Sequence, residues 1–447
     1  MRDRSGAVAS SRLVRTYLVI AGLYTLSASL IWGVNTLFLL DAGLDIFEVF
    51  VVNAAFTAGM VLFEIPTGVV ADTRGRRLSF LLSAITLLIG TLGYIAISVA
   101  GGGLVLFVLA SVVLGLGFCF YSGAVEAWLV DGLKASGYDG ELDRVFARGE
   151  MASGAAMVVG TVGGGFLGDL DLAWPYVGRA VLLLGVFAVA LGWMRDVGFT
   201  PRASTLSAMP AQMRAVLRAS LAYGWGRRSI RLVMIVSFIQ TGFMMWGFYA
   251  WQPYFLELLG QNRVWVAGVV TALIALATIA GNGVVEFFAR FCGRRTTLLL
   301  WAAGVLAFAT IGVGLARPFW LAVTLLVLAT GTLGVAGPVT QAYLHSVIPS
   351  EQRATVVSFD SLVGSAGGIG GQVGLGYVAR AESIATGYVL GGVVLLAALP
   401  VLVLLRRLGE AADVIVGRAG RRAPCAAQGL PEVTAVDTSA RQPISAP

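Results

Sequence analysis

Long runs of apolar residues, separated by short charged segments, dominate the chain. A helix that crosses a bilayer needs about 20 mostly apolar residues, and many of the uncharged runs reach that length. The run 78–125 is too long for one helix, so we place a turn at the three glycines 101–103. Twelve spanning helices are predicted, at 17–40, 46–71, 78–100, 104–125, 151–168, 174–194, 232–256, 264–285, 296–316, 318–344, 361–379 and 383–405.

The composition identifies the solvent of these helices. Hydrophobic residues make up 57% of the 447 residues and charged residues only 12%, whereas about a quarter of a typical soluble chain is charged. A surface so poor in charge requires lipid around it. The predicted fold class is therefore an all-α integral membrane protein with the lipid bilayer as its partner.

The basic residues indicate which way the helices run. Of the 31 lysines and arginines, 27 fall on the side of the N-terminus, and the opposite loops are assigned only Arg179, Arg263, Arg317 and Arg380. By the positive-inside rule, both termini and the central loop face the cytoplasm. We expect a multi-pass protein of the cell membrane without a cleaved signal, because a short basic lead runs straight into a full span.

The chain divides into two similar halves. The predicted parts are a cytoplasmic lead 1–16, a six-helix bundle 17–194, a cytoplasmic linker 195–229, a second six-helix bundle 230–405 and a mostly disordered tail 406–447. At an offset of 210 residues, Glu150, Gly154, Gly160 and Gly164 correspond to Asp360, Gly364, Gly370 and Gly374. Parallel six-helix repeats around a midplane site are typical of transporters that work by alternating access.

Residue counts exclude several chemistries. Lys134 is the only lysine and precedes alanine, so there is no Walker A loop. His345 is the only histidine, and the three cysteines are far apart, which leaves no metal site and no disulfide framework. We expect no cofactor, no bound metal and no nucleic-acid partner.

The loop between the second and third predicted helices reads Gly68-Val-Val-Ala-Asp72-Thr-Arg74-Gly75-Arg76-Arg77. It resembles the loop 2-3 signature of the major facilitator superfamily, with Thr73 at the usual first basic position. The resemblance implies two pseudo-symmetric six-helix bundles and a cytoplasmic gate. The gate residues that it implies are Gly68, Asp72, Arg74, Gly75, Arg76 and Arg77, with Asp131 at the end of helix 4 and Asp360 at the start of helix 11.

The same resemblance implies how the gate closes. Asp72 would face the beginning of helix 11, where free backbone N–H groups favour an anion, near 355–360. Arg76 would pair with Asp131. The corresponding loop of the second half carries Arg290 in place of the aspartate, so the gate is expected to be asymmetric.

Acidic residues inside predicted spans are candidates for proton coupling, because buried charges are costly and usually functional. Glu126 continues a stripe of small or polar residues along helix 4, formed by Ser111, Gly115, Phe118 and Ser122, which we expect to face a cavity. Two interpretations of Glu126 stay open, a proton carrier and a member of the Arg76 latch. Glu64 is the second candidate carrier, and the alternative for it is a wetted gate residue.

Helix 7 is rich in aromatic residues and methionine, which suits varied apolar or cationic ligands; an interfacial aromatic belt explains much of the same pattern. The predicted substrate-binding residues are Asn35, Asn53, Phe118, Ser122, Phe238, Gln240, Met245, Tyr249, Gln252 and Gln341. Glycine-rich helix 5 resembles the signature of drug:proton antiporters, although Thr161 replaces its proline and helix 4 lacks the arginine usual there.

These features predict a monomeric, proton-coupled exporter of small, largely apolar molecules. An uptake symporter or facilitator of the same fold is the main alternative. A membrane-embedded enzyme or a receptor is a distant one, because the sequence offers neither a catalytic motif nor an output domain.

Overall fold

The computed structural model describes residues 2–201, 218, 224–261, 263–348 and 352–415, and the regular structure of these residues is helical. Most of the predicted linker and the tail beyond residue 415 lie outside the described residues. The first half consists of α1 (Arg2–Ser29), α2 (Asn35–Asp41), α3 (Ile46–Arg74), α4 (Arg76–Val99), α5 (Leu104–Tyr121), α6 (Ala124–Ala135), α7 (Leu142–Leu170) and α8 (Trp174–Trp193).

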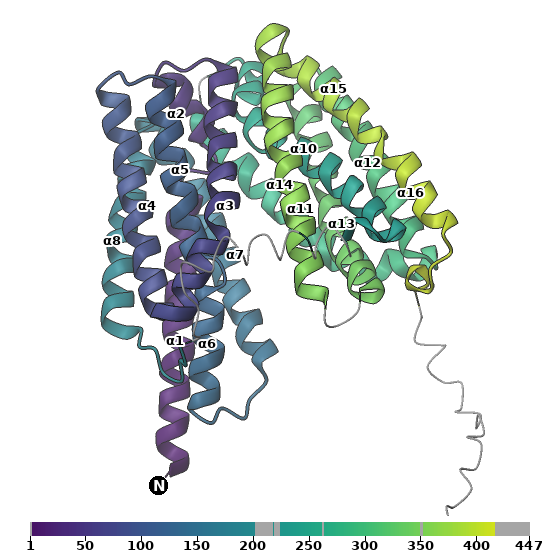
Figure 1. The fold of residues 1–447 in the computed structure, drawn as a ribbon. Coiled ribbons are helices and arrows are strands. Elements are labelled where there is room, and N and C mark those ends of the chain that lie inside the picture. The colour runs from purple at the N-terminus through teal and green to yellow at the C-terminus, as the bar shows by residue number, and fades with distance from the viewer. Residues whose placement is uncertain (1, 202–217, 219–223, 262, 349–351, 416–447) are drawn as a thin grey trace, which may run out of the picture.

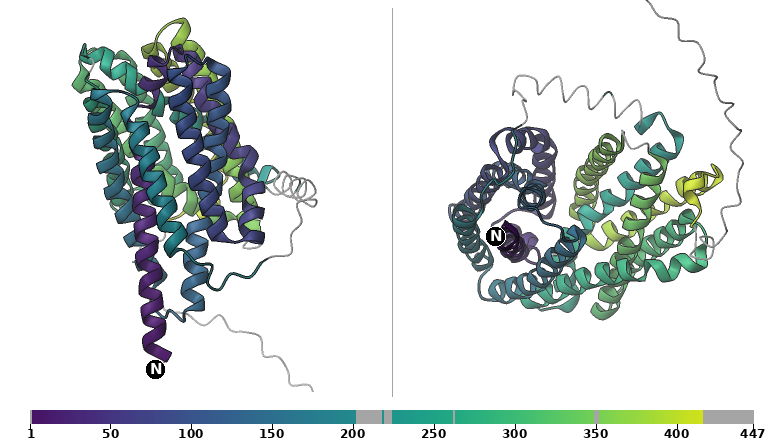
Figure 2. Two further views of the ribbon diagram at one scale, coloured as in Figure 1. Left: turned by 90° about the vertical axis from the view of Figure 1, so that its left-hand side faces the viewer. Right: turned by 90° about the horizontal axis from the view of Figure 1, so that it is seen from below.

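The second half begins after the linker. It consists of α10 (Arg228–Leu259), α11 (Val264–Cys292), α12 (Arg295–Leu315), α13 (Phe319–Val347), α14 (Arg353–Ala381), α15 (Ile384–Leu396) and α16 (Ala398–Arg407), followed by the short 3-10 helix η4 (Ala411–Asp413). Figures 1 and 2 show two bundles standing side by side, one from each half.

Twelve transmembrane helices account for this architecture. Ten are long and apolar enough by themselves, counting α5 with α6 and α15 with α16 as single spans. The other two are α1, which continues into α2, and α14. The described part of α1 carries four arginines in its first half, and α14 combines polar residues with many glycines, so both are less apolar than their neighbours.

Three of the predicted spans are broken. The first bends at 30–34 between α1 and α2, the fourth at Ser122 and Gly123, and the last at Ala397. Gly123 has a φ of 72°, in the left-handed region that favours glycine. The turn predicted at 101–103 is confirmed, whereas the lead 2–16, expected to be a polar segment, forms the start of α1 and projects beyond the bundle (Figure 2).

The glycine stripes let equivalent helices pack closely in both halves. Helix α7 packs on α1, and α14 packs on α10. A Cβ added to Gly160 would lie 3.0 Å from the carbonyl oxygen of Leu26, and one added to Gly242 would lie 3.0 Å from that of Gly367. Small residues allow such backbone contact between membrane helices. In the second half Gly242 and Gly367 make the contact, whereas the repeat glycines Gly370 and Gly374 meet no atom within 4 Å of an added Cβ.

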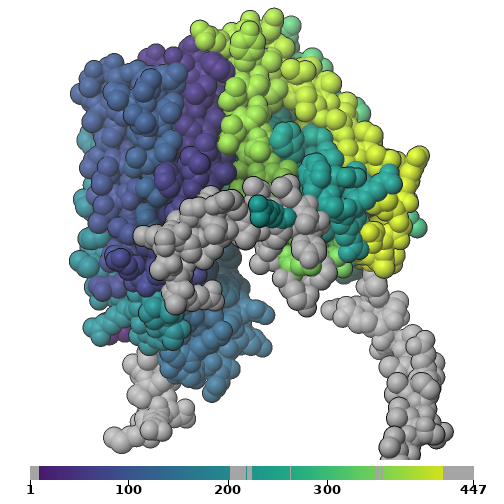
Figure 3. Space-filling view, in the orientation of Figure 1, coloured from purple at the N-terminus to yellow at the C-terminus, as the bar shows by residue number. Residues whose placement is uncertain are grey.

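The two bundles meet at one end of the molecule. We call the end with the N-terminus and Arg74–Arg77 the basic end, and the opposite end, with Asp45 and Arg317, the far end. At the far end Arg380 Nη2 lies 3.3 Å from Asp45 Oδ2, and the N–H of Val264 donates to Asp169 Oδ1 at 2.9 Å. At the basic end the bundles diverge (Figures 1 and 3).

Candidate central cavity

A cavity of about 380 Å³ lies in the middle of the molecule, mostly inside the first bundle. This volume falls in the range of small-molecule sites. Its walls come from α1, α2, α3, α4, α5 and α8, with Tyr249 of α10 closing it from the second bundle. The lining residues are Tyr24, Thr25, Ala28, Ile31, Trp32, Asn35, Asn53, Phe56, Leu87, Tyr94, Leu114, Phe118, Tyr121, Arg179 and Tyr249.

Arg179 is the only charged residue among the described residues that line this cavity. It lies in the second turn of α8 and is 8% exposed. Its assignment to an outer loop was therefore wrong, because α8 begins at Trp174 and carries the arginine into the span. The signal was present in the sequence, since Arg179 is the one charge within 174–194 and intramembrane charges are usually functional.

No acidic side chain accompanies this arginine in the described chain. The titratable groups within electrostatic range of its guanidinium are four tyrosines, Tyr24, Tyr94, Tyr176 and Tyr249. The Nε atom is buried and has no hydrogen-bond partner among the described residues. A buried charge normally has a partner, because the cost of desolvation is several kcal/mol. Arg179 is thus an uncompensated cation in a mainly aromatic cavity.

A buried chain of hydrogen bonds fixes the wall next to Arg179. The Tyr176 hydroxyl donates to Asn35 Oδ1 at 2.8 Å, and Asn35 Nδ2 donates to Asn53 Oδ1 at 3.0 Å. Asn53 Nδ2 in turn donates to the Val49 carbonyl at 2.9 Å. The predicted residues Asn35 and Asn53 both line the cavity, and this chain ties α8, α2 and α3 together.

Gln252 closes the cavity at the far end. Its Oε1 accepts the backbone N–H of Thr36 at 3.0 Å, and its Nε2 donates to the Trp32 carbonyl at 2.7 Å. The Thr36 hydroxyl donates to the Tyr249 carbonyl at 2.9 Å. Gln252 is fully buried and was predicted to contact substrate, but in this structure both ends of its amide hold the two bundles together.

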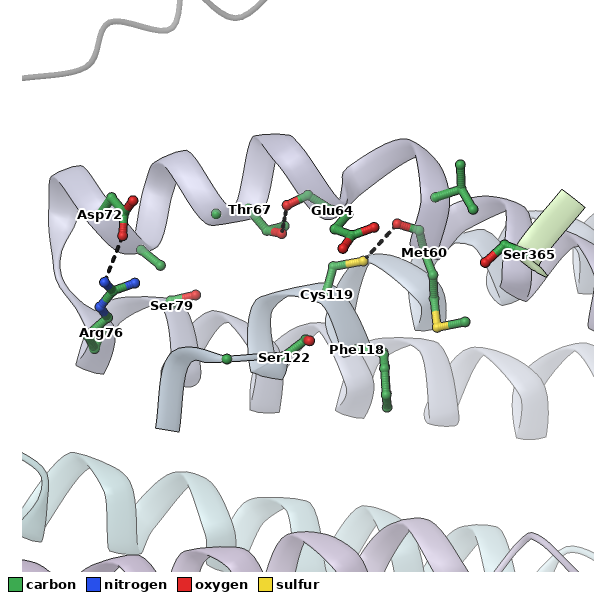
Figure 4. A pocket seen from close by; sticks show the side chains of 14 residues that line it. Met60, Glu64, Thr67, Asp72, Arg76, Ser79, Phe118, Cys119, Ser122 and Ser365 are labelled. Atoms are coloured by element: carbon green, nitrogen blue, oxygen red, sulfur yellow. Dashed lines mark hydrogen bonds and ion pairs between the residues drawn. The ribbon is translucent and has the colours of Figure 1, made fainter. Parts of the chain in front are cut away.

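A second cavity, of about 320 Å³, lies toward the basic end and shares Phe118 with the central one. Figure 4 shows its residues: Glu64 lies beside Cys119, Ser122 lies below them, and Ser365 is contributed by α14 of the other bundle. The predicted residues Glu64, Gly68, Asp72, Arg76, Phe118 and Ser122 all line it. The second cavity therefore adjoins the central cavity on the side where the two bundles diverge.

The loop 2-3 motif forms the basic end of this second cavity. Arg76 Nη2 lies 2.7 Å from Asp72 Oδ1. Gly75 has a φ of 109°, as the tight turn between α3 and α4 requires. The N–H of Arg77 donates to Asp196 Oδ1 at 2.9 Å, and its side chain donates to the Leu191 carbonyl at 2.7 Å. Gly68 has no atom within 4 Å of an added Cβ, so its surface is open.

Two members of the predicted gate, Arg76 and Asp360, have other contacts in this structure. Arg76 is paired with Asp72, so its contact with Asp131 stays a prediction. Asp360 accepts a hydrogen bond from Ser237 within its own bundle, and its other oxygen is buried without a partner in the described chain. The side chain of residue 355 lies outside the described part.

Glu126 lies just after the break in helix 4, in the first turn of α6. Its Oε2 is buried and has no hydrogen-bond partner among the described residues. Tyr17 and Tyr121 lie within electrostatic range of each other, and each lies in range of both Glu126 and Glu150. The Tyr121 ring stacks on Tyr24 with centroids 3.6 Å apart, and both rings line the central cavity. Aromatic side chains therefore link the Glu126 cluster to the cavity of Arg179.

The stripe of small or polar residues predicted along the fourth span, 104–125, and continued by Glu126 does not face one cavity. Ser111 is buried against the Tyr94 hydroxyl, and Gly115 packs on the backbone of α3. Phe118 and Ser122 line cavities, and the break at Gly123 then changes the direction of the helix before Glu126. Ser111 and Gly115 are used in packing within the continuous part of the span, and the break places Glu126 on a separate helix, so the predicted stripe does not form one face.

The substrate-binding residues predicted on the seventh span, which is α10 in the structure, do not line one cavity either. Only Tyr249 lines the central cavity. Phe238 lies in an apolar groove between α10, α14 and α15, and Met245 packs against Gly368 of α14. Gln240 is half-buried on α10, and Gln341 is exposed on α13. Most of the predicted face is thus helix packing, as expected where glycines of α14 approach α10.

A family model described as Major Facilitator Superfamily matches residues 17–372, most of the chain. The chain belongs to the major facilitator superfamily. A curated relative, an uncharacterized MFS-type transporter of Bacillus subtilis (strain 168) named YxaM, is 22% identical over 376 residues, covering 80% of this chain and 88% of the relative.

Solved structures support the same fold. The nucleoside transporter NupG matches with a TM-score of 0.72 at 12% identity, covering 88% of this chain and 99% of that one. A D-xylose-proton symporter matches with a TM-score of 0.62 at 17% identity, covering 88% and 97%. At these identities the two structures show that the fold is shared. A small-molecule transport role in a membrane follows from membership of the superfamily. The likeness does not extend to the drug:proton antiporter branch.

Proposed function

We propose that this superfamily member is a proton-coupled exporter of small organic molecules and acts as a monomer in the cell membrane. The basic end faces the cytoplasm in this proposal, as the distribution of arginines predicts. The central cavity is then closed toward the outside by Gln252 and neighbouring contacts, and it is approached from the inside through the second cavity. A single chain supplies both bundles and the whole cavity wall.

The observation that carries proton coupling is the carboxyl of Glu126. One of its oxygens is buried without a partner in the described chain, and acidic side chains within membrane spans are usually functional. Glu126 also lies close to Tyr17 and Tyr121, whose hydroxyls can pass a proton or hydrogen-bond the acid. Arg76, the alternative partner of Glu126 in a latch, is occupied by Asp72 in this structure.

The loop 2-3 motif serves as the inner gate in this proposal. Its surface at Gly68 is open here, and Asp72 and Arg76 lie at the mouth of the second cavity. When the bundles rock together at the basic end, this surface meets α14, on which Ser365 already borders the cavity. The gate therefore closes as the far end opens.

Glu126→Gln tests the coupling. A substrate is first found by an efflux screen in cells that lack their own exporters, with and without a protonophore. The variant protein is then reconstituted into liposomes with an imposed pH gradient. We expect gradient-driven transport of that substrate to be lost, because glutamine keeps the shape of the side chain and cannot release a proton, while substrate binding is retained.

Two control variants separate coupling from general damage. Glu141→Gln removes an exposed carboxylate that pairs with Arg144 on the surface and should transport normally. Glu64→Gln tests the second candidate in the inner cavity. Full gradient-driven transport by Glu126→Gln would refute the proposed role, and loss in Glu64→Gln alone would transfer it to Glu64.

A further inference from the structure

We infer that the transported molecule is an organic anion, with a carboxylate held by Arg179 and an apolar body held by the aromatic walls of the central cavity. The inference rests on the proposed transport function and specifies its substrate class. It replaces the expectation of neutral or cationic ligands that the aromatic content of helix 7 suggested.

The charge lining the central cavity favours an anionic ligand. Arg179 is the one charge lining the cavity, and within the described chain no carboxylate lies in range of it. Two like charges about 4 Å apart repel by about 4 kcal/mol at an effective dielectric constant of about 20, so this cavity disfavours a cation. An anion instead supplies the partner that the buried guanidinium lacks.

The hydrogen-bond donors around Arg179 also suit a carboxylate. The guanidinium offers several N–H donors in a planar fork that matches a carboxylate, and its Nε is buried without a partner in the described chain. The hydroxyls of Tyr24 and Tyr249 line the same space and lie in range of Arg179. Both are able to donate to an anionic oxygen. The groups around Arg179 therefore offer donors for an anion, and no carboxylate of the described chain occupies them.

The apolar walls and the volume of the central cavity limit the body of the ligand. Trp32, Ile31, Phe56 and Leu114 provide apolar wall on the same lining. The volume of about 380 Å³ admits a small molecule with one ring system and is too small for a large conjugate. One cation and extended apolar walls suit a monocarboxylate with an aromatic or aliphatic body.

The test compares matched probes on the purified full-length protein in detergent. Naphthalene-2-carboxylate, its primary amide and naphthalen-2-ylmethylammonium differ mainly in charge, and calorimetry gives the affinity of each; 3-cyclohexylpropionate and its amide repeat the comparison with an aliphatic body. We expect each carboxylate to bind at least about tenfold more tightly than its amide, as a hydrogen bond to a charged group commonly contributes. In Arg179→Gln this ratio should fall to about one, with the affinity for the amide unchanged.

A stability measurement separates a binding role from a structural one. An arginine with no partner destabilises the empty protein, so Arg179→Gln should melt at the same temperature as the parent or higher. Arg179→Lys keeps the charge and should retain part of the preference for carboxylates. A fall in melting temperature by several degrees, together with loss of binding of every probe, would assign Arg179 a structural role and overturn the inference.

Other outcomes also decide the question. Equal binding of carboxylate and amide, tighter binding of the ammonium, or binding of no carboxylate at all would overturn the inference, as would saturation of the site by chloride alone. Because binding in detergent needs no pH gradient, a clear preference for carboxylates combined with absent transport would refute the proposed function and leave this assignment standing.

Discussion

Tyr176 precedes Arg179 by three residues on α8, so the two side chains lie on one face of that helix. The ring of Tyr176 is almost fully buried, and its hydroxyl bonds Asn35, which bonds Asn53. The face of α8 that carries the arginine is therefore tied to α2 and α3 by a chain of hydrogen bonds. Residues that hold a binding side chain in this way influence affinity without touching the ligand.

Tyr176→Phe removes only the hydroxyl that begins this chain. The buried Asn35 oxygen then loses the hydrogen bond that it accepts, which costs about 1 to 3 kcal/mol. We expect a lower free energy of unfolding in detergent and weaker binding of naphthalene-2-carboxylate. Tyr377→Phe, at a side chain that is 63% exposed, is the control and should change neither quantity; an unchanged stability of Tyr176→Phe would contradict this role of the chain.

Arg179 and its surroundings also show what could be predicted from the sequence. The amides Asn35 and Asn53 and the ring of Tyr249 were predicted as binding residues, and all three line the cavity. Arg179 was missed because counting charges by loop assigned every basic residue to one side or the other. The tyrosines around it come from α1, α4, α8 and α10, so their convergence depends on tertiary packing that no local pattern contains.

At the scale of elements, hydropathy predicted the spans. The glycines that bring the backbones of α10 and α14 together, Gly242, Gly367 and Gly371, are not those of the predicted repeat. The breaks in the helices were not predictable in this way. Gly123 at the break is one of many glycines in the chain, and only its positive φ distinguishes it from glycines inside helices. The break places Glu126 on a separate helix, and before the break Ser111 and Gly115 pack against α4 and α3, so the predicted stripe was wrong on both sides of Gly123.

The repeat extends to the way two helices begin. Asp196, which follows α8, accepts the N–H of Arg77 at the start of α4. Asp413, which follows α16, has the same role at the start of α12. Its carboxylate accepts the backbone N–H of Thr296 at 2.7 Å and the Thr296 hydroxyl at 2.9 Å. An anion near a helix N-terminus stabilises it, so each half uses a distant carboxylate for the same purpose.

Asp413→Ala tests this arrangement in the second half. Asp413 is 3% exposed, and its loss leaves the first turn of α12 without its acceptor. We expect the free energy of unfolding to fall by about 1 to 3 kcal/mol, measured by denaturation in detergent. Asp196→Ala should cost less because its bond is exposed; a larger loss for Asp196→Ala would contradict the explanation.

At the scale of the molecule, the two bundles are joined where small residues meet. A Cβ on Gly165 of α7 would lie 2.9 Å from the Cα of Gly268 on α11, and one on Gly268 would lie 2.5 Å from the Thr161 carbonyl oxygen. Phe50 of α3 stacks near Trp246 of α10, with ring centroids 5.7 Å apart. This far-end contact has to separate if the central cavity is to open outward.

The central claim is that the cavity around Arg179 is reached from the two sides of the membrane in turn. Ala28 lines that cavity, so Ala28→Cys, in a variant without the native cysteines 119, 292 and 425, reports its accessibility. A membrane-impermeant maleimide is applied to right-side-out and to inside-out vesicles. Gly268→Val is added to weaken the far-end contact, and Gly163→Val is the control, because an added Cβ at Gly163 meets no atom within 4 Å.

We predict that the thiol introduced by Ala28→Cys reacts from both sides when the far-end contact is intact. Gly268→Val should raise the labelling rate from the far side and lower it from the basic side, whereas Gly163→Val should leave both rates unchanged. Labelling from one side alone, with and without Gly268→Val, would contradict alternating access through this cavity.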